Sequence, residues 1–254
     1  MEYYRRLAER TIGRVLTKVH APDAWFLKKG LSGVFLAEAL VGTSFVAARR
    51  IGKLLLLDTE GRGTLGVRFG MTGRLLVDGL AGVGQLLYCS PREEPAWDRL
   101  RLVFADGGDL VVRDPRRLGG VFLDPDESRL GVDAAAITRA GLARVLAESG
   151  APLKARLLDQ SRLAGVGNLI ADEVLFRAGL DPARPAGTLA PAETRRLHRH
   201  LRQTVDDLIE RGGSHTGALV PMRSPGGICP RDGTPLQRRT IGGRTTWSCP
   251  RHQR

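Results

Sequence analysis

A glycine-rich turn between two helix-like stretches constrains this chain more than any other feature. Residues 157–176 carry helical apolar spacing on both sides of Gly165-Val166-Gly167, and the turn leads into Asn168. Glycines permit a tight or left-handed turn, and asparagine is favourable at the N-cap of a helix. We therefore expect Asn168 to cap the second helix. Free N–H groups at a helix start attract anions, so the turn is a candidate phosphate site, with an ordinary capped helical hairpin as the alternative.

The charge of the chain favours a polyanionic partner. Its 254 residues hold 39 Lys plus Arg against 27 Asp plus Glu, a net charge of +12. Such a surplus attracts nucleic acid, although a membrane surface would explain charge alone equally well. The sequence has neither a secretory pattern at its start nor an apolar run of membrane-spanning length. We therefore expect a cytoplasmic protein, associated with the nucleoid.

Hydrophobic periodicity divides the chain into three parts. Residues 1–128 begin with a short amphipathic helix over 2–13 and continue as short apolar runs bounded by Gly and Asp, which predict a β-sandwich. The predicted strands are Val34–Ala39, Ser44–Ala47, Lys53–Leu57, Thr64–Phe69, Arg74–Val77, Leu100–Phe104, Asp109–Val112 and Gly120–Leu123. Residues 129–222 have helix-length periodicity instead. The predicted helices are Asp133–Ser149, Pro152–Asp159, Asn168–Ala178 and Pro191–Arg211.

A small separate module is predicted over residues 223–254. Cys229 and Asp232 form one knuckle and Cys249 and His252 a second, each with two residues between its members, and a β-hairpin lies between the knuckles. All four side chains can bind zinc, so the spacing predicts one zinc ion. The alternative is a hairpin that has lost its metal and keeps its shape by packing. Only one other cysteine, Cys89, occurs in the chain, which excludes a disulfide scaffold.

Three further segments carry candidate functional side chains. Met71 lies between two glycines on a turn out of a strand, where core filling is the ordinary role of methionine. The turn Asp114-Pro115-Arg116-Arg117 suits either a solvated loop or phosphate neutralisation with a wedge into a base stack. Lys53 precedes an apolar strand, and Arg244 follows two glycines at the predicted hairpin tip, within reach of a phosphate.

In this order, the segments resemble the formamidopyrimidine-DNA glycosylase and endonuclease VIII family of base-excision repair enzymes. The resemblance spans essentially the whole chain. It rests on Gly-Lys-Leu-Leu-Leu around Lys53, Gly-Met-Thr-Gly-Arg-Leu around Met71, Asp-Pro-Arg-Arg around Arg117, the block ending at Asn168, and Gly-Gly-Arg-Thr around Arg244. It implies an α+β fold with an N-terminal β-sandwich, a helix–two-turn–helix domain and a C-terminal zinc-finger hairpin, with DNA in the cleft between the first domain and the others.

The resemblance also implies roles for individual residues. Lys53 and Arg244 become candidate catalytic residues, and both contact phosphates around the lesion. The DNA-binding set implied by the resemblance is Arg68, Met71, Arg116, Arg117, Lys154 and Asn168. In this picture Met71 and Arg117 fill the gap left by a damaged nucleotide that has flipped out of the stack. The partner is double-stranded damaged DNA, bound by a monomer that uses one zinc ion.

The sequence departs from the family pattern at several positions. The family begins with a proline, whose amine attacks the sugar, and a glutamate that transfers protons, whereas this chain begins Met1-Glu2 and has neither. Leu118 replaces the usual phenylalanine wedge, and Trp97 and Arg99 replace a His-Asp-His pattern. Gly150 replaces a basic residue.

Three functions are consistent with this pattern. The first is a DNA glycosylase with abasic-site lyase activity on oxidised bases. The second is a non-catalytic binder of damaged or abasic DNA, and the third is a lyase that uses the amine of Lys53. The resemblance begins only a few residues after the point at which the family has its N-terminal proline. We therefore also expect the native start to lie upstream. The codon of Met1 would then be a GTG, which is read as valine in the longer protein.

Overall fold

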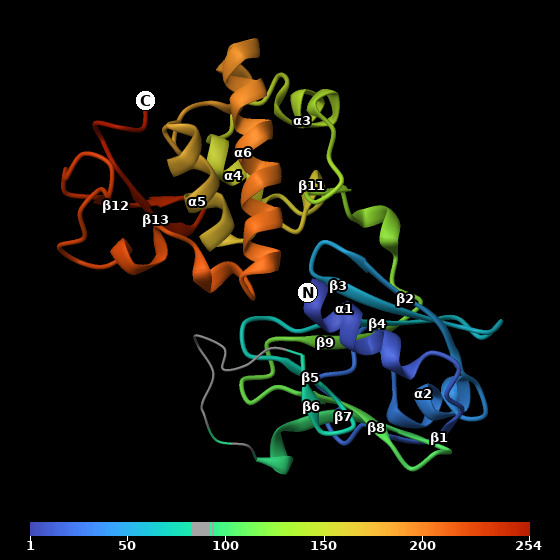
Figure 1. Ribbon diagram of the computed structural model, residues 1–254. Coiled ribbons are helices and arrows are strands. Elements are labelled where there is room, and N and C mark those ends of the chain that lie inside the picture. The colour runs from blue at the N-terminus through green and yellow to red at the C-terminus, as the bar shows by residue number, and fades with distance from the viewer. Residues whose placement is uncertain (83–91, 93) are drawn as a thin grey trace. The chain divides into compact units, whose positions relative to one another are not determined.

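The computed structural model describes residues 1–82, 92 and 94–254, and Cys89 lies outside these residues. The chain folds into two compact units, Met1–Glu127 and Ser128–Arg254 (Figure 1). The predicted helical domain and hairpin module together make up the second unit. Among the described residues, no helix combines the length and the apolar character needed to cross a bilayer.

The first unit is a sandwich of two antiparallel sheets. One sheet has the strand order β1-β7-β8-β5-β6 and the other β2-β3-β4-β9. The strands are β1 (Leu16–His20), β2 (Phe45–Ile51), β3 (Leu54–Thr59), β4 (Thr64–Arg68), β5 (Arg74–Val77), β6 (Leu80–Ala81), β7 (Asp98–Phe104), β8 (Asp109–Arg113) and β9 (Gly120–Leu123). The predicted β-sandwich is thereby confirmed.

Alternation of side chains builds the core between the two sheets. In β7 every second residue is buried, and Leu100, Leu102 and Phe104 all face inward. They pack in the same cluster as Leu57 and Val67 of the opposite sheet. Burial of one face of each sheet is what fixes the strand register, because a slip of one residue would turn that face to solvent.

Two helices flank these sheets, and one of them corrects a prediction. The predicted opening helix is α1 (Glu2–Ala8), followed by a 3-10 turn, η1 (Glu9–Thr11). The predicted strand Val34–Ala39 is instead part of α2 (Gly33–Leu40). Ser32 caps it by accepting a hydrogen bond from the Phe35 N–H, and Leu36 and Leu40 are buried one turn apart. A short apolar run by itself does not distinguish a strand from a buried helix. Here the Ser32 cap favours the helix.

The second unit packs four helices around one core. They are α3 (Arg139–Leu146), α4 (Leu153–Leu158), α5 (Asn168–Ala178) and α6 (Pro191–Glu210). The first is shorter than predicted because residues before Thr138 form a turn on the Asp133 carboxylate and a short parallel pair, β10 (Val132–Asp133) with β11 (Leu163–Ala164). As predicted, Pro191 stands in the first turn of α6.

The hairpin of the second unit is formed by β12 (Gln237–Ile241) and β13 (Arg244–Ser248). It lies beside α5 (Figure 1) and shares a small core with it, in which Phe176 of α5 packs with Leu236 and Trp247. The remaining 3-10 turns are η2 (Pro95–Trp97), η3 (Glu127–Arg129), η4 (Ala186–Thr188), η5 (Ser214–Thr216) and η6 (Val220–Met222).

Candidate nucleic-acid interface

The first unit gathers its predicted site residues at one end of the sandwich. Leu54, Arg68 and Gly120 are register partners across β3, β4 and β9, and Arg74 is the partner of Arg113 across β5 and β8. The two loops that cross between the sheets, residues 69–73 and 114–119, therefore both start and end at this end. The turn that carries Lys53 lies there too, because it immediately precedes β3.

Asp114 ties the two crossing loops together. Its side chain is completely buried and accepts hydrogen bonds from the Thr72 hydroxyl (2.5 Å) and the Gly119 N–H (2.8 Å). The Arg116 N–H also donates to it, over 3.2 Å. A buried carboxylate with several donors is well satisfied and fixes the backbone that supplies them. The methionine motif and the Asp-Pro-Arg-Arg motif are thus two parts of one structure.

Met71 and Leu118 are the apolar tips of these loops. Gly70, which precedes Met71, has a φ of +58°, and a Cβ on it would lie 2.7 Å from the Leu118 backbone carbon. Only glycine allows this approach, so the backbone just before Met71 lies against Leu118. Both side chains are exposed, Met71 by 52% and Leu118 by 44%. Exposed large apolar side chains on adjacent loops are suited to act as a stacking wedge.

Basic side chains border this wedge. Lys53 is exposed in the two-residue turn between β2 and β3, Arg68 is exposed at the end of β4 with its guanidinium 5.3 Å from the Phe122 ring centre, and Arg116 and Arg117 are exposed beside Leu118. The wedge and its cations therefore share one end of the sandwich.

The start of α1 lies at the same end. The Tyr4 hydroxyl donates to the Gly73 carbonyl (3.0 Å), and its ring packs on Phe69. Glu2 forms an ion pair with Arg50 over 3.1 Å, two residues before the turn that ends at Lys53. The first residues of the described chain are thus held next to the wedge.

In the second unit, the glycine-rich turn differs from the prediction by one residue. Gly167, in an extended conformation, is the N-cap of α5, and Asn168 is the first helical residue. Asn168 does not cap its own helix, since its side-chain N–H donates to the Thr245 carbonyl of the hairpin (3.1 Å). Gln160 holds the turn from within: its amide donates to the Leu158 and Val166 carbonyls and accepts from the Gly165 N–H.

The hairpin tip is pressed against α4. Gly242 and Gly243 have φ values of +58° and +70°, and a Cβ on Gly242 would lie 2.8 Å from that of Ala155. A Gly-Gly pair with both φ positive is typical of a tight two-residue hairpin turn. Arg244 follows the turn and is exposed. Because the Asn168 side chain bonds the Thr245 carbonyl, Asn168 lies beside the strand that carries Arg244.

Lys154 has a different place from the one predicted. It is completely buried, 2.6 Å from an Asp172 carboxylate oxygen, and it also donates to the Thr245 carbonyl (3.1 Å) and the Thr246 hydroxyl (2.7 Å). Burial lowers the pKa of its amine, although Asp172 opposes this. Arg223 pairs with Asp172 as well, over 2.8 Å. In this state Lys154 is out of reach of DNA and holds the hairpin strand instead.

Three of the four predicted metal ligands lie together. Donor atoms of Cys229, Asp232 and Cys249 are within 4.8 Å of one another. Hydrogen bonds to Asp232, of which that from the Thr234 N–H has the largest effect, lower its pKa to about 2 and keep it ionised. Two sulfurs and a carboxylate oxygen are a donor set that suits zinc.

His252 is not part of this group. Its Nε2 lies 2.7 Å from the Phe176 carbonyl, its ring packs edge-on against that of Phe176, and its backbone N–H donates to the Cys249 sulfur. The structure therefore differs from the predicted four-residue set at this one position, because the ring already has a hydrogen-bond partner on α5.

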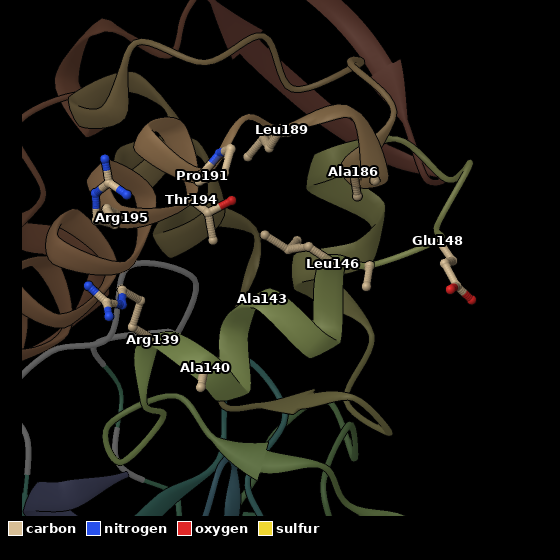
Figure 2. A pocket seen from close by; sticks show the side chains of 12 residues that line it. Arg139, Ala140, Ala143, Leu146, Glu148, Ala186, Leu189, Pro191, Thr194 and Arg195 are labelled. Carbon is tan, nitrogen blue, oxygen red and sulfur yellow. The ribbon is translucent and has the colours of Figure 1, made fainter.

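A cavity of about 540 Å³ lies elsewhere in the second unit, between α3 and the start of α6 (Figure 2). Alanine and leucine side chains line much of it, with Arg139 and Arg195 at one end and Glu148 at the other. The predicted site residues are not among those that line it. We therefore do not assign it to the functional site.

Sequence reasoning missed the residues that hold the site together. Asp114, Gln160 and Asp172 stand inside the motifs or directly after them. The roles of Asp114 and Asp172 depend on partners far along the chain, whereas Gln160 bonds only residues within the turn itself. The one available signal was an acidic residue at a buried position of a predicted helix, as for Asp172 in α5, which usually has a charged partner.

Comparison with known proteins agrees with this geometry. Residues 1–121 match the family model of the formamidopyrimidine-DNA glycosylase N-terminal domain, and residues 130–219 match that of the formamidopyrimidine-DNA glycosylase H2TH domain. The formamidopyrimidine-DNA glycosylase of Thermus thermophilus is 36% identical over 97% of this chain and 93% of its own length. That of Paracoccus denitrificans is 33% identical over 97% of this chain and 95% of its own.

Solved structures show the same architecture. The Fpg protein of Lactococcus lactis in complex with DNA containing FAPY-dG has a TM-score of 0.82 and 25% identity, over 100% of this chain and 98% of that chain. The crystal structure of the Thermus thermophilus protein has a TM-score of 0.79 and 33% identity, over 99% and 96%. Fold and site thus define a DNA repair glycosylase with a helix–two-turn–helix domain. More specifically, the chain belongs to the formamidopyrimidine-DNA glycosylase family.

Proposed function

We propose that this protein excises oxidised bases, formamidopyrimidines among them, from double-stranded DNA and cleaves the resulting abasic site. The observation that carries the proposal is the pair of exposed apolar tips, Met71 and Leu118, on two loops that Asp114 and Gly70 hold together beside exposed cations. A duplex with one nucleotide turned out of its stack offers a gap that such a wedge fills. Arg117 lies next to Leu118, in reach of the same gap.

Two surfaces grip the backbone in this proposal. Lys53 and Arg68 neutralise phosphates from the end of the sandwich. In the second unit, the exposed Arg244 and the first N–H groups of α5 beside Asn168 bind phosphate oxygens. Lys154 acts indirectly, because it fixes the strand that carries Arg244.

One zinc ion is part of the proposal. Cys229, Asp232 and Cys249 hold it, and His252 is the fourth donor once its ring leaves the Phe176 carbonyl. When bound, the ion cross-links the two knuckles of the hairpin module and takes no part in the reaction. The metal ligands affect DNA binding only indirectly, because they stabilise the hairpin that carries Arg244.

A second candidate is a non-catalytic binder of damaged or abasic DNA. It needs the exposed apolar tips and the cations that border them, but no amine nucleophile. A third, a lyase that uses Lys53, requires that amine to attack the sugar. All three share the same DNA-binding surface and differ only in the covalent step.

Borohydride trapping on abasic duplex separates these candidates. Attack of an amine on the open sugar aldehyde forms an imine, which borohydride reduces to a stable protein–DNA adduct. An adduct that maps to the amino-terminal peptide and persists in Lys53→Ala would support the first candidate. Loss of the adduct in Lys53→Ala, with DNA binding intact, would support the third candidate. Binding without any adduct would support the second.

A further inference from the structure

Arg117 is held in an unusual conformation by an acidic residue from a distant loop. Its φ is +56°, a region that residues other than glycine rarely adopt. Its guanidinium donates to an Asp23 carboxylate oxygen over 2.6 Å. The side chain of Arg117 is half-exposed, whereas that of Asp23 is only 8% exposed. The buried partner therefore sets the position of the exposed one.

Asp23 also engages a second arginine. Its other oxygen lies 3.4 Å from Arg99, and Arg99 in turn donates to the Asp114 carbonyl over 2.9 Å. The Trp25 N–H donates to Asp23 from within its own loop. Burial alone would raise the pKa of Asp23, but the hydrogen bond from Arg117 and the charges of Arg117 and Arg99 outweigh it and lower that pKa. The carboxylate thus stays ionised between two guanidinium groups.

We propose that Asp23 is a positioning residue that keeps Arg117 away from intact DNA and ready for a damaged site. While Asp23 neutralises it, Arg117 offers little attraction to the phosphates of an undamaged duplex. A gap in the base stack presents hydrogen-bond acceptors at the loop tip, where Arg117 is already placed. This inference rests on the proposed function, because it assigns a selectivity to the residue that fills the gap.

The consequence concerns the ratio of two affinities. An arginine released from its carboxylate gains a phosphate contact on any duplex, and each such contact adds about 0.9 to the salt slope of binding. Asp23→Asn should therefore bind undamaged duplex several-fold more tightly, with a salt slope larger by about 0.9. Its preference for a duplex with an abasic site over an undamaged one should fall by roughly tenfold. One charge-assisted contact is lost from the gap, and one is gained at a phosphate.

The test uses a charge-matched control and a double-mutant cycle. Glu38→Gln removes one negative charge from an exposed position of α2 and should leave the preference unchanged. In the Arg117→Ala background, Asp23→Asn should have no further effect on the preference, because Asp23 acts through Arg117. An effect of equal size in that background, or an unchanged preference in Asp23→Asn alone, would overturn the proposal.

A second readout separates this inference from the proposed function. In the DNA-free protein, hydrogen exchange of the Arg117 guanidinium protons should be slow in the wild type and fast in Asp23→Asn. Fast exchange in the wild type would refute the proposal that Asp23 holds the Arg117 guanidinium. A wild-type protein with slow exchange but no preference for abasic DNA would instead refute the proposed function, and with it the selectivity assigned to Asp23.

Discussion

Asp172→Leu should destabilise the second unit by about 4 kcal/mol, since removal of one partner from a buried ion pair leaves an uncompensated charge. Two cations lose their counter-ion here, because Lys154 (2.6 Å) and Arg223 (2.8 Å) both pair with this carboxylate. Lys154 is fully buried and has no access to water. The loss should appear as faster amide hydrogen exchange in α4, α5 and β13, with the first unit unaffected.

The matched control is Asp206→Leu in α6. Asp206 is exposed and pairs with Arg202 over 3.9 Å, so the same substitution should change stability by less than about 0.5 kcal/mol. Equal exchange rates in Asp172→Leu and Asp206→Leu would mean that the buried cluster contributes no more than a surface pair. That outcome would contradict the proposal that Lys154 fixes the hairpin.

Loss of the metal should have the second large effect. The wild-type protein, purified without chelator, should contain one zinc per chain, and Cys249→Ser should contain little. Structural zinc contributes about 10–16 kcal/mol in small zinc-dependent modules, so its loss should unfold residues 223–254 and abolish DNA binding. Hydrogen exchange in α3 and α6 should stay slow, because their shared core lies apart from the metal ligands.

The matched control is Cys89→Ser, at the one cysteine that is not a proposed metal ligand. It should leave the zinc content unchanged. Wild-type protein without zinc would contradict the metal proposal. Phe176 and Trp247 would then hold the hairpin by packing alone. Because His252 already bonds the Phe176 carbonyl, His252→Ala should further show whether three donors suffice: retention of zinc would limit the ligands to Cys229, Asp232 and Cys249.

The fold was predictable where the pattern along the chain was local. Strands of the sandwich follow from alternation, as in β7, and α6 follows from its apolar spacing and its proline at the start. The strand predicted over Val34–Ala39 was wrong because the helix there depends on one cap, Ser32, and on burial that only the tertiary structure supplies.

The site was predictable as a set of motifs but not as a set of contacts. Neighbouring glycines and turn residues mark Met71, Arg117 and Asn168 as candidate site residues in the sequence. Their partners do not, because Asp23 and Arg117 are 94 residues apart and Asn168 and Thr245 are 77 apart. Lys154 illustrates the limit: as a lysine in a basic chain it suggests DNA contact, whereas its burial against Asp172 depends on a pairing that the sequence order does not reveal.

The central claim is that this chain removes a damaged base, and release of that base tests it most directly. Purified protein is incubated with a duplex that contains one formamidopyrimidine, and the free base is quantified by mass spectrometry beside a binding assay on the same duplex. We expect release of the free base from the lesion duplex and none from an undamaged control. Tight, lesion-selective binding without any released base would contradict the claim and leave a binder of damaged DNA as the better description.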